Sequence, residues 1–215
     1  LDSFVALADA GAAEFLCETA CHSVSALGHP DEFEAQVVEQ RAVIEDLFGA
    51  RPTTFRNTEL ILRNDIAQKV EELGFDLMLG EGADRLLDWR KPFWLYRPKD
   101  CKRLKLMLRC YPLSDDIGFR FSNRKWDEYP LTADKFAKWI HALPVETPLV
   151  GLFMDYETFG EHQWADTGIL DFNQSGGPVL GIDLGTCNSA ACYVRDGKPV
   201  MVDLSDLGRG EHDVT

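Results

Sequence analysis

Apolar and polar positions alternate along the chain in two rhythms, one helical and one strand-like. Apolar residues three and four positions apart predict helices over 33–48, 64–73 and 132–143. Polar residues that can cap a helix stand at the three starts, and glycines follow two of the ends; the caps are Asp31, Asn64 and Thr132, and the glycines are Gly49 and Gly74. We therefore expect three helices, each with one buried face.

Compact apolar runs between these helices predict strands. The runs lie at 53–57, 75–79, 104–110, 117–121 and 149–154. Alternation of strands and helices is typical of a parallel sheet with crossover helices, which predicts an α/β fold for residues 1–172. With 215 residues, the chain is long enough for one domain or two small ones.

The pattern changes after Phe172. Residues 173–178 have the composition of a linker. Beyond the linker, strands are predicted at 179–183, 190–194 and 199–204, with a hairpin turn at Asp196-Gly197. The sequence is thus divided into a first part, 1–172, the linker, and a short antiparallel β segment, 179–215.

Composition narrows the classes of partner. The chain has 36 acidic and 22 basic residues and a net charge of −14, which disfavours nucleic acid and favours a neutral or cationic ligand. No apolar run approaches the roughly 18 residues that cross a bilayer, so no membrane partner is expected. The six cysteines form no CxxC pair, which argues against structural zinc and predicts reduced thiols in a cytoplasmic protein.

Two polar loops that follow predicted strands carry the candidate chemistry. Glu59 follows the strand at 53–57, and Asp155 follows the strand at 149–154. In parallel α/β folds such loops hold the active site, so the sheet could bring the two carboxylates face to face. A carboxylate pair can cleave a glycosidic bond, because one attacks the sugar and the other protonates the leaving oxygen. From local sequence alone, both side chains could instead cap the next helices.

A metal site is the rival interpretation of the same loops. Mixed oxygen and nitrogen ligands are available from Asp155, Glu157, Glu161, His162 and His22. However, no HExxH or His-x-His pattern is present, and the adjacent Glu161 and His162 would not share a helix face. We therefore expect no metal and no cofactor, with a metal-dependent carbohydrate deacetylase as the alternative enzyme. His22 could also be a core histidine satisfied by Ser23.

Six segments, in order, resemble the α-amylase-type members of glycoside hydrolase family 57. They are Glu18-Thr19 with His22-Ser23, Phe55 to Leu60, Leu113 to Ile117, Phe119 to Ser122, Tyr129 to Lys135, and Met154 to His162. The resemblance covers about residues 16–172 and implies part of a distorted (β/α)7, TIM-like barrel that hydrolyses α-glucans with retention. It assigns the nucleophile to Glu59 and the general acid/base to Asp155. The sugar-binding candidates are then His22, Arg56, Asp116, Glu157, His162 and Trp164.

Two features of the family pattern are missing. A histidine followed by Gln-Pro, expected on the first strand, is absent, and so is a motif after the acid/base strand. The chain is therefore expected to be a fragment or a fusion that holds a middle slice of the catalytic domain. In an intact site of the retaining type, the two carboxyl groups are expected to lie about 5–5.5 Å apart.

The segment over about residues 179–204 resembles the amino-terminal phosphate-loop hairpin of the 70-kDa heat-shock chaperone ATPases. The matching residues run from Leu180 to Ser189 and from Asp196 to Pro199. The resemblance implies the start of an actin-like ATPase fold and an ATP and magnesium site at Asp183, Gly185, Thr186 and Asn188. Because one hairpin cannot enclose a nucleotide, a hairpin without ligand is the favoured interpretation, and an ATP-binding module is the alternative.

Overall fold

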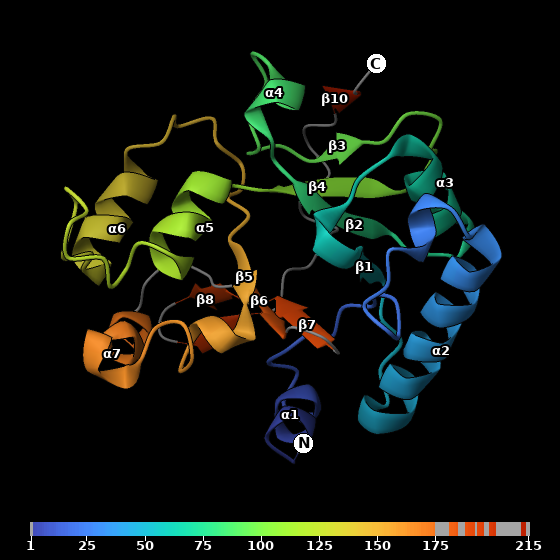
Figure 1. Ribbon diagram of the computed structural model, residues 1–215, viewed down its shortest axis with the longest axis horizontal. Helices are drawn as coiled ribbons and strands as arrows, with labels where there is room; N and C mark the ends of the chain where they lie inside the picture. Colours follow the sequence, from blue (N-terminus) through green and yellow to red (C-terminus); the bar gives the residue numbers. More distant parts are fainter. Residues whose placement is uncertain are drawn as a thin grey trace.

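The computed structural model describes residues 2–174 and, beyond them, the backbone of five short strands; side chains are described up to Phe172. The larger sheet has the strand order β1-β2-β4-β3-β10 (Figure 1). Its strands are β1 (Thr54–Arg56), β2 (Leu77–Glu81), β4 (Lys105–Arg109), β3 (Tyr96–Arg97) and β10 (His212–Asp213). β1, β2 and β4 are parallel, whereas β3 runs antiparallel to β4 and pairs in parallel with β10.

One further parallel segment lies on each side of the run β1-β2-β4. Cys17 bridges Phe55 of β1, and Gly151 bridges Arg109 of β4. Gly151 leads directly into β5 (Phe153–Asp155). Five segments therefore run in the same direction, and parallel segments have their carboxyl ends at the same edge of a sheet.

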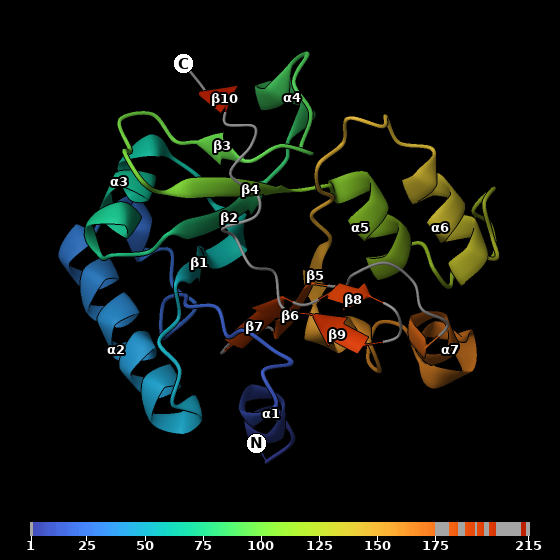
Figure 2. The same ribbon diagram turned by 180° about the vertical axis from the view of Figure 1, so that it is seen from behind.

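The helices form two groups, with α2 and α3 on one side and α5, α6 and α7 on the other (Figure 2). Their bounds are α1 (Asp2–Asp9), α2 (Pro30–Phe48), α3 (Asn64–Glu72), α4 (Asp84–Leu87), α5 (Tyr111–Gly118), α6 (Ala133–His141) and α7 (Ile169–Gln174). Short 3-10 helices are η1 (Ser25–Leu27), η2 (Thr58–Leu60), η3 (Tyr156–Thr158) and η4 (Ala165–Thr167).

Alternation along β2 explains how the core is divided. Met78 packs with the apolar residues of α2 and α3, including Val37 and Val70, whereas Leu77 and Leu79 pack on the other face with Phe153 of β5. A separate cluster joins α5, α6 and α7; it includes Met154, Ile117, Phe136, Ile169 and Phe172. Consecutive residues of β5 thus enter two different clusters, which is the period-two pattern of a strand buried on both faces.

The chain beyond α7 forms short strands. β6 (Gly181–Leu184) pairs in parallel with β5 and antiparallel with β7 (Asn188–Ala191). β8 (Tyr193–Arg195) and β9 (Lys198–Val200) are antiparallel, which confirms the antiparallel character predicted here. The predicted turn Asp196-Gly197 lies outside the described residues. The first two residues of the predicted linker, Asn173 and Gln174, belong to α7.

Several predicted elements differ in detail. The predicted strand at 117–121 is wrong, because Ile117 lies inside α5, whose first turn contains Pro112. A proline with its fixed φ fits the first turn of a helix, and Ile117 and Phe121, four residues apart, both enter the cluster of α6 and α7. The predicted strand at 149–154 is reduced to β5 and the bridge at Gly151.

The helix ends are partly as predicted. Thr132 caps α6, with its Oγ1 accepting the Lys135 N–H at 3.3 Å, and Gly49 ends α2 in the left-handed region. The caps predicted at Asp31 and Asn64 are wrong. α2 already begins at Pro30 with His29 as its N-cap, and Asn64 is the first residue of α3.

The predicted α/β class is confirmed as a mixed sheet with flanking helices. Closure into a (β/α)7 barrel, the actin-like ATPase start and the three-part division of the chain stay predictions. Within the described residues, no helix has both the length and the apolar character to span a bilayer.

Candidate active site

The candidate residues gather along the carboxyl edge of the parallel segments. Glu18 follows the bridge residue Cys17, Glu59 follows β1, Glu81 and Arg109 end β2 and β4, and Asp155 ends β5. In parallel α/β folds this edge is where loops from several strands converge on a ligand. Glu59 thus follows β1 and Asp155 is the last residue of β5, two segments that run in the same direction.

Glu59 stands in a strained turn directly after β1. Its φ is 54°, and that of Leu60 is 52°, values that side-chain-bearing residues rarely adopt. Polar contacts hold the turn: Thr58 Oγ1 lies 3.0 Å from Thr19 Oγ1, and Asn57 Nδ2 donates to the Ile61 carbonyl at 3.0 Å. Strain that surrounding contacts maintain in this way is frequent at functional sites.

A chain of charged and polar groups supports the Glu59 carboxylate. His22 Nε2 lies 3.0 Å from Glu59 Oε1, and His22 Nδ1 lies 3.5 Å from Glu18 Oε2. The same Glu18 oxygen accepts from Arg56 Nη1 at 3.0 Å. Glu18 and Arg56 are buried, whereas the Glu59 side chain is 71% exposed. The buried pair Glu18 and Arg56 thus supports His22, and Glu59 is the solvent-exposed end of this series of contacts.

These contacts settle the local alternatives for His22 and Glu59. His22 pairs with two carboxylates, while the Ser23 hydroxyl donates to Ser25 Oγ at 2.7 Å, so the core-histidine interpretation is wrong. Glu59 does not cap α3, because the N-cap of that helix is Arg63 and the Glu59 side chain contacts His22. Asp155 occupies the N-cap position of η3 but makes no capping hydrogen bond with its side chain.

The loop after Asp155 carries three of the predicted sugar contacts, Glu157, His162 and Trp164. Its backbone is folded on itself, since the Glu157 carbonyl accepts the His162 N–H at 3.0 Å. Gln163, only 2% exposed, anchors the loop by donating to the Gly118 carbonyl at 2.9 Å. Trp164 is 65% exposed, so its ring is available to stack on a sugar.

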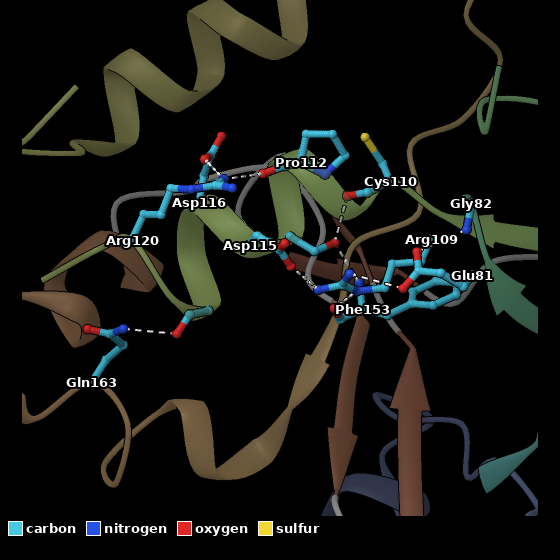
Figure 3. Close-up of polar contacts among 12 residues, drawn as sticks. Glu81, Gly82, Arg109, Cys110, Pro112, Asp115, Asp116, Arg120, Phe153 and Gln163 are labelled. Atoms are coloured by element: carbon cyan, nitrogen blue, oxygen red, sulfur yellow. Dashed lines mark hydrogen bonds and ion pairs between the residues drawn. The ribbon is translucent and has the colours of Figure 1, made fainter. Parts of the chain in front are cut away.

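Asp116 and Arg56, two further predicted sugar contacts, are each paired with another side chain, and their role toward a sugar stays a prediction. Arg56 is 8% exposed and its guanidinium is bound to Glu18, which makes it a support for the site. Asp116 is turned toward Arg120, which donates to it at 2.5 Å (Figure 3). Burial raises the pKa of the Asp116 carboxyl, and the Arg120 guanidinium opposes that rise.

A second charged cluster, which was not predicted, lies at this edge. Arg109 donates from all three guanidinium nitrogens, to Glu81, to Asp115 and to the Phe153 carbonyl (Figure 3). Asp115, and not its neighbour Asp116, therefore faces the edge. The available signal was the position of Arg109, a lone cation at the end of the predicted strand 104–110.

Within the residues whose side chains are described, no three His, Cys, Asp or Glu residues are grouped closely enough to hold a metal ion. The predicted nucleotide contacts lie beyond Phe172, where no side chains are described. Asp183 belongs to β6 and Asn188 is the first residue of β7. Gly185 and Thr186 lie outside the described residues, so this site stays a prediction.

Comparison with known proteins now identifies the family. Residues 1–175 match the family described as Glycosyl hydrolase family 57. The chain belongs to glycosyl hydrolase family 57. A Methanocaldococcus jannaschii protein named "Putative alpha-amylase" is 47% identical over 173 residues, which are 80% of this chain and 36% of that protein. The chain therefore spans about a third of the length of this relative.

One solved structure shares the fold. The crystal structure of 4-alpha-glucanotransferase from Thermococcus litoralis superposes with a TM-score of 0.63 at 18% identity, over 85% of this chain and 29% of that one. The structure titled "Crystal structure of putative polysaccharide deacetylase from Mycobacterium smegmatis" has a TM-score of only 0.39 at 15% identity, over 56% of this chain and 40% of that one. The family match over residues 1–175 confirms the resemblance to family 57 over the first part of the chain.

Proposed function

We propose that the chain is part of a retaining glycoside hydrolase that acts on α-glucans, with Glu59 as the nucleophile and Asp155 as the general acid/base. The observation that carries this proposal is that both carboxylates follow parallel strands at one carboxyl edge. Membership of family 57 supports it, as do the names of its relatives, an α-amylase and a 4-α-glucanotransferase.

In the first step, Glu59 attacks the anomeric carbon while Asp155 protonates the oxygen of the departing sugar. In the second step, Asp155 removes a proton from an acceptor hydroxyl, which attacks the glycosyl-enzyme and releases Glu59. His22 holds Glu59 Oε1, so that the second oxygen, Oε2, is free to attack. Both steps proceed with carboxylates alone, and we propose no cofactor.

The loop 156–164 and the residue His22 supply the proposed contacts to glucan. The exposed ring of Trp164 stacks on a sugar face, and the imidazole of His162 and the carboxylate of Glu157 bond to hydroxyls. Such contacts suit a neutral polymer and agree with the net charge of −14, which repels polyanions.

Isosteric removal of each carboxylate tests the proposal in the full chain. We expect Glu59→Gln and Asp155→Asn each to lower turnover of a maltooligosaccharide by at least about 100-fold, because each carboxylate takes part in bond breaking. The matched control is Glu39→Gln, an exposed glutamate on α2, which should keep wild-type turnover. Wild-type turnover in either site variant would refute the assignment.

The configuration of the product tests the retaining mechanism separately. Two displacements at the anomeric carbon should release the α-anomer first, which NMR can observe before mutarotation. Release of the β-anomer would show a single displacement and remove the role of Glu59 as nucleophile.

A further inference from the structure

β5 is held beside β4 mainly by side chains. The strand ladder between them contains one bridge, Arg109 with Gly151, and the Cys110 N–H donates to the Gly151 carbonyl at 2.7 Å. Two residues later, the backbone of Phe153 is bound by side chains. Arg109 Nε donates to its carbonyl at 2.8 Å, and its N–H donates to Ser114 Oγ at 3.2 Å.

Arg109 itself is held in a fixed orientation. Its Nη1 donates to Glu81 Oε2 at 3.2 Å and its Nη2 to Asp115 Oδ1 at 2.5 Å (Figure 3). The other Glu81 oxygen accepts the Gly82 N–H at 2.9 Å, so this carboxylate is fixed as well. The Arg109 side chain is 12% exposed, which shields these contacts from solvent. The planar guanidinium therefore joins β2, α5 and β5 in one geometry.

This arrangement matters because β5 ends at Asp155, two residues after the bound peptide group. Side chains two residues apart on a strand project from the same face, so the position of Phe153 sets the direction of Asp155. A displacement of about 1 Å in a reacting group can cost about 100-fold in rate. The contacts of Arg109 lie close enough to Asp155 to control that displacement.

We propose that Arg109 is a positioning residue for Asp155. The inference rests on the proposed function, because it takes Asp155 as the general acid. Arg109 does not touch the substrate; it fixes the end of β5 so that the Asp155 carboxyl lies within reach of the leaving oxygen. Arginine is required because only its fork of donors serves three acceptors in one plane, whereas lysine presents a single ammonium group.

The test is Arg109→Lys in the full chain, which keeps the positive charge beside Glu81 and Asp115. The readout is kcat/KM on two substrates, a maltooligosaccharide and an aryl α-glucoside with an acidic phenol as leaving group. Protonation assists departure of a sugar but is hardly needed for an acidic phenol. We expect a loss of at least about 10-fold on the maltooligosaccharide and under about threefold on the aryl glucoside.

The matched control is Arg103→Lys. Arg103 also bonds a carboxylate and a carbonyl, Asp76 Oδ1 at 3.1 Å and the Phe75 carbonyl at 3.3 Å, but it precedes β4 at the opposite edge of the sheet. It should keep wild-type values on both substrates. Equal losses on the two substrates in Arg109→Lys, or no loss, would overturn the positioning role, since destabilisation alone lowers both in proportion.

The same experiment separates this inference from the proposed function. Asp155→Asn should show the leaving-group pattern more strongly than Arg109→Lys, and Glu59→Gln should lose both substrates. If Asp155→Asn and Glu59→Gln behave in this way and Arg109→Lys does not, only the positioning role fails. If either carboxylate variant keeps wild-type activity, the proposed function fails.

A second measurement does not need turnover. Hydrogen exchange of the backbone amides at 153–155 should become at least about 10-fold faster in Arg109→Lys, because a carbonyl that anchors β5 is released. Ser114→Ala removes the other bond to Phe153 and should have the same direction of effect. Unchanged exchange in Arg109→Lys would show that Arg109 does not hold β5.

Discussion

Each edge of the sheet carries an arginine paired with an aspartate, but the two pairs have different roles. At the amino edge, Arg103 pairs with Asp76, and the two side chains are 56% and 52% exposed. At the carboxyl edge, Arg109 pairs with Asp115, and the side chains are 12% and 22% exposed. Both arginines also bond backbone carbonyls. The difference in burial indicates that the first pair closes a loop in solvent, whereas the second fixes a geometry.

The carboxylates show the same contrast. At the amino edge, the Glu71 carboxylate accepts the N–H groups of Lys102, Arg103 and Leu104, which joins the loop before β4 to α3. At the carboxyl edge, Glu59 stands at a positive φ with its side chain largely open to solvent. The Glu71 carboxylate binds backbone N–H groups, whereas the Glu59 carboxylate contacts His22 and stays accessible to a ligand.

The largest expected effect comes from the close approach of strands at the carboxyl edge. A Cβ at Gly151 would lie 2.5 Å from the Leu108 carbonyl oxygen, a backbone atom that cannot turn away. We expect Gly151→Ala to lower the free energy of unfolding by about 3 kcal/mol. Gly118→Ala is the control, because no atom lies within 4 Å of its added Cβ. Urea denaturation measures both, and equal stabilities would show that β4 and β5 tolerate wider spacing.

The next effect concerns the buried pair. Asp115→Ala leaves Arg109 Nη2 without its acceptor in a poorly hydrated place, so we expect a loss of about 2 kcal/mol in the free energy of unfolding. Alanine is the better helix former, which means that loss of α5 propensity cannot explain a decrease. A loss below about 0.5 kcal/mol would show that the less exposed pair contributes no more to the free energy of unfolding than an exposed pair, which would contradict the comparison of the two edges.

The fold was predictable where local pattern decides the structure. β1 and β4 lie within predicted apolar runs, β2 overlaps its run but extends two residues beyond it, to Glu81, and Thr132 caps α6 as its position indicates. The extent of β5 was not predictable, because Phe153 pairs with β6 on one side, whereas Arg109 and Ser114 take the place of strand pairing on the side of β4. The pattern of apolar and polar residues in the sequence does not indicate such side-chain contacts.

The site divides in the same way. Glu59 and Asp155 could be placed because each follows a strand in the sequence. The cluster around Arg109 could not, because Glu81 lies 28 residues from Arg109 and is brought to it only by pairing of β2 with β4. The positive φ at Leu60 was equally hidden, since leucine does not favour that conformation and the surrounding contacts impose it.

A smaller effect, which depends on pH, is expected at the amino edge. Burial would raise the pKa of Glu71, but the N–H groups of Leu104, Arg103 and Lys102 outweigh it and lower the pKa. Because the pKa is lower in the folded state, the stabilisation is complete above the unfolded value, about 4.3, and is lost as the pH falls through the folded value.

Glu71→Gln should therefore cost about 1 kcal/mol at pH 7, a figure kept small because the side chain is partly exposed. The difference from the wild type should shrink as the pH is lowered below about 4. Denaturant titrations at a series of pH values measure it. Glu72→Gln, at an exposed neighbour that pairs only loosely with Lys69 at 3.7 Å, is the control. A difference that grows toward low pH would contradict the role of the charged carboxylate.

The smallest effect completes the comparison between the two arginines. Asp76→Ala removes the carboxylate partner of Arg103, but water can replace that partner because both side chains are more than half exposed. We expect a loss under about 0.5 kcal/mol, reduced further in 1 M salt, where the screening length falls to about 3 Å. The loss in Asp115→Ala should persist in the same salt, because that pair is shielded from solvent. If both losses vanished in salt, the two edges would be electrostatically alike, and Arg109 would hold β5 no more firmly than Arg103 holds its loop.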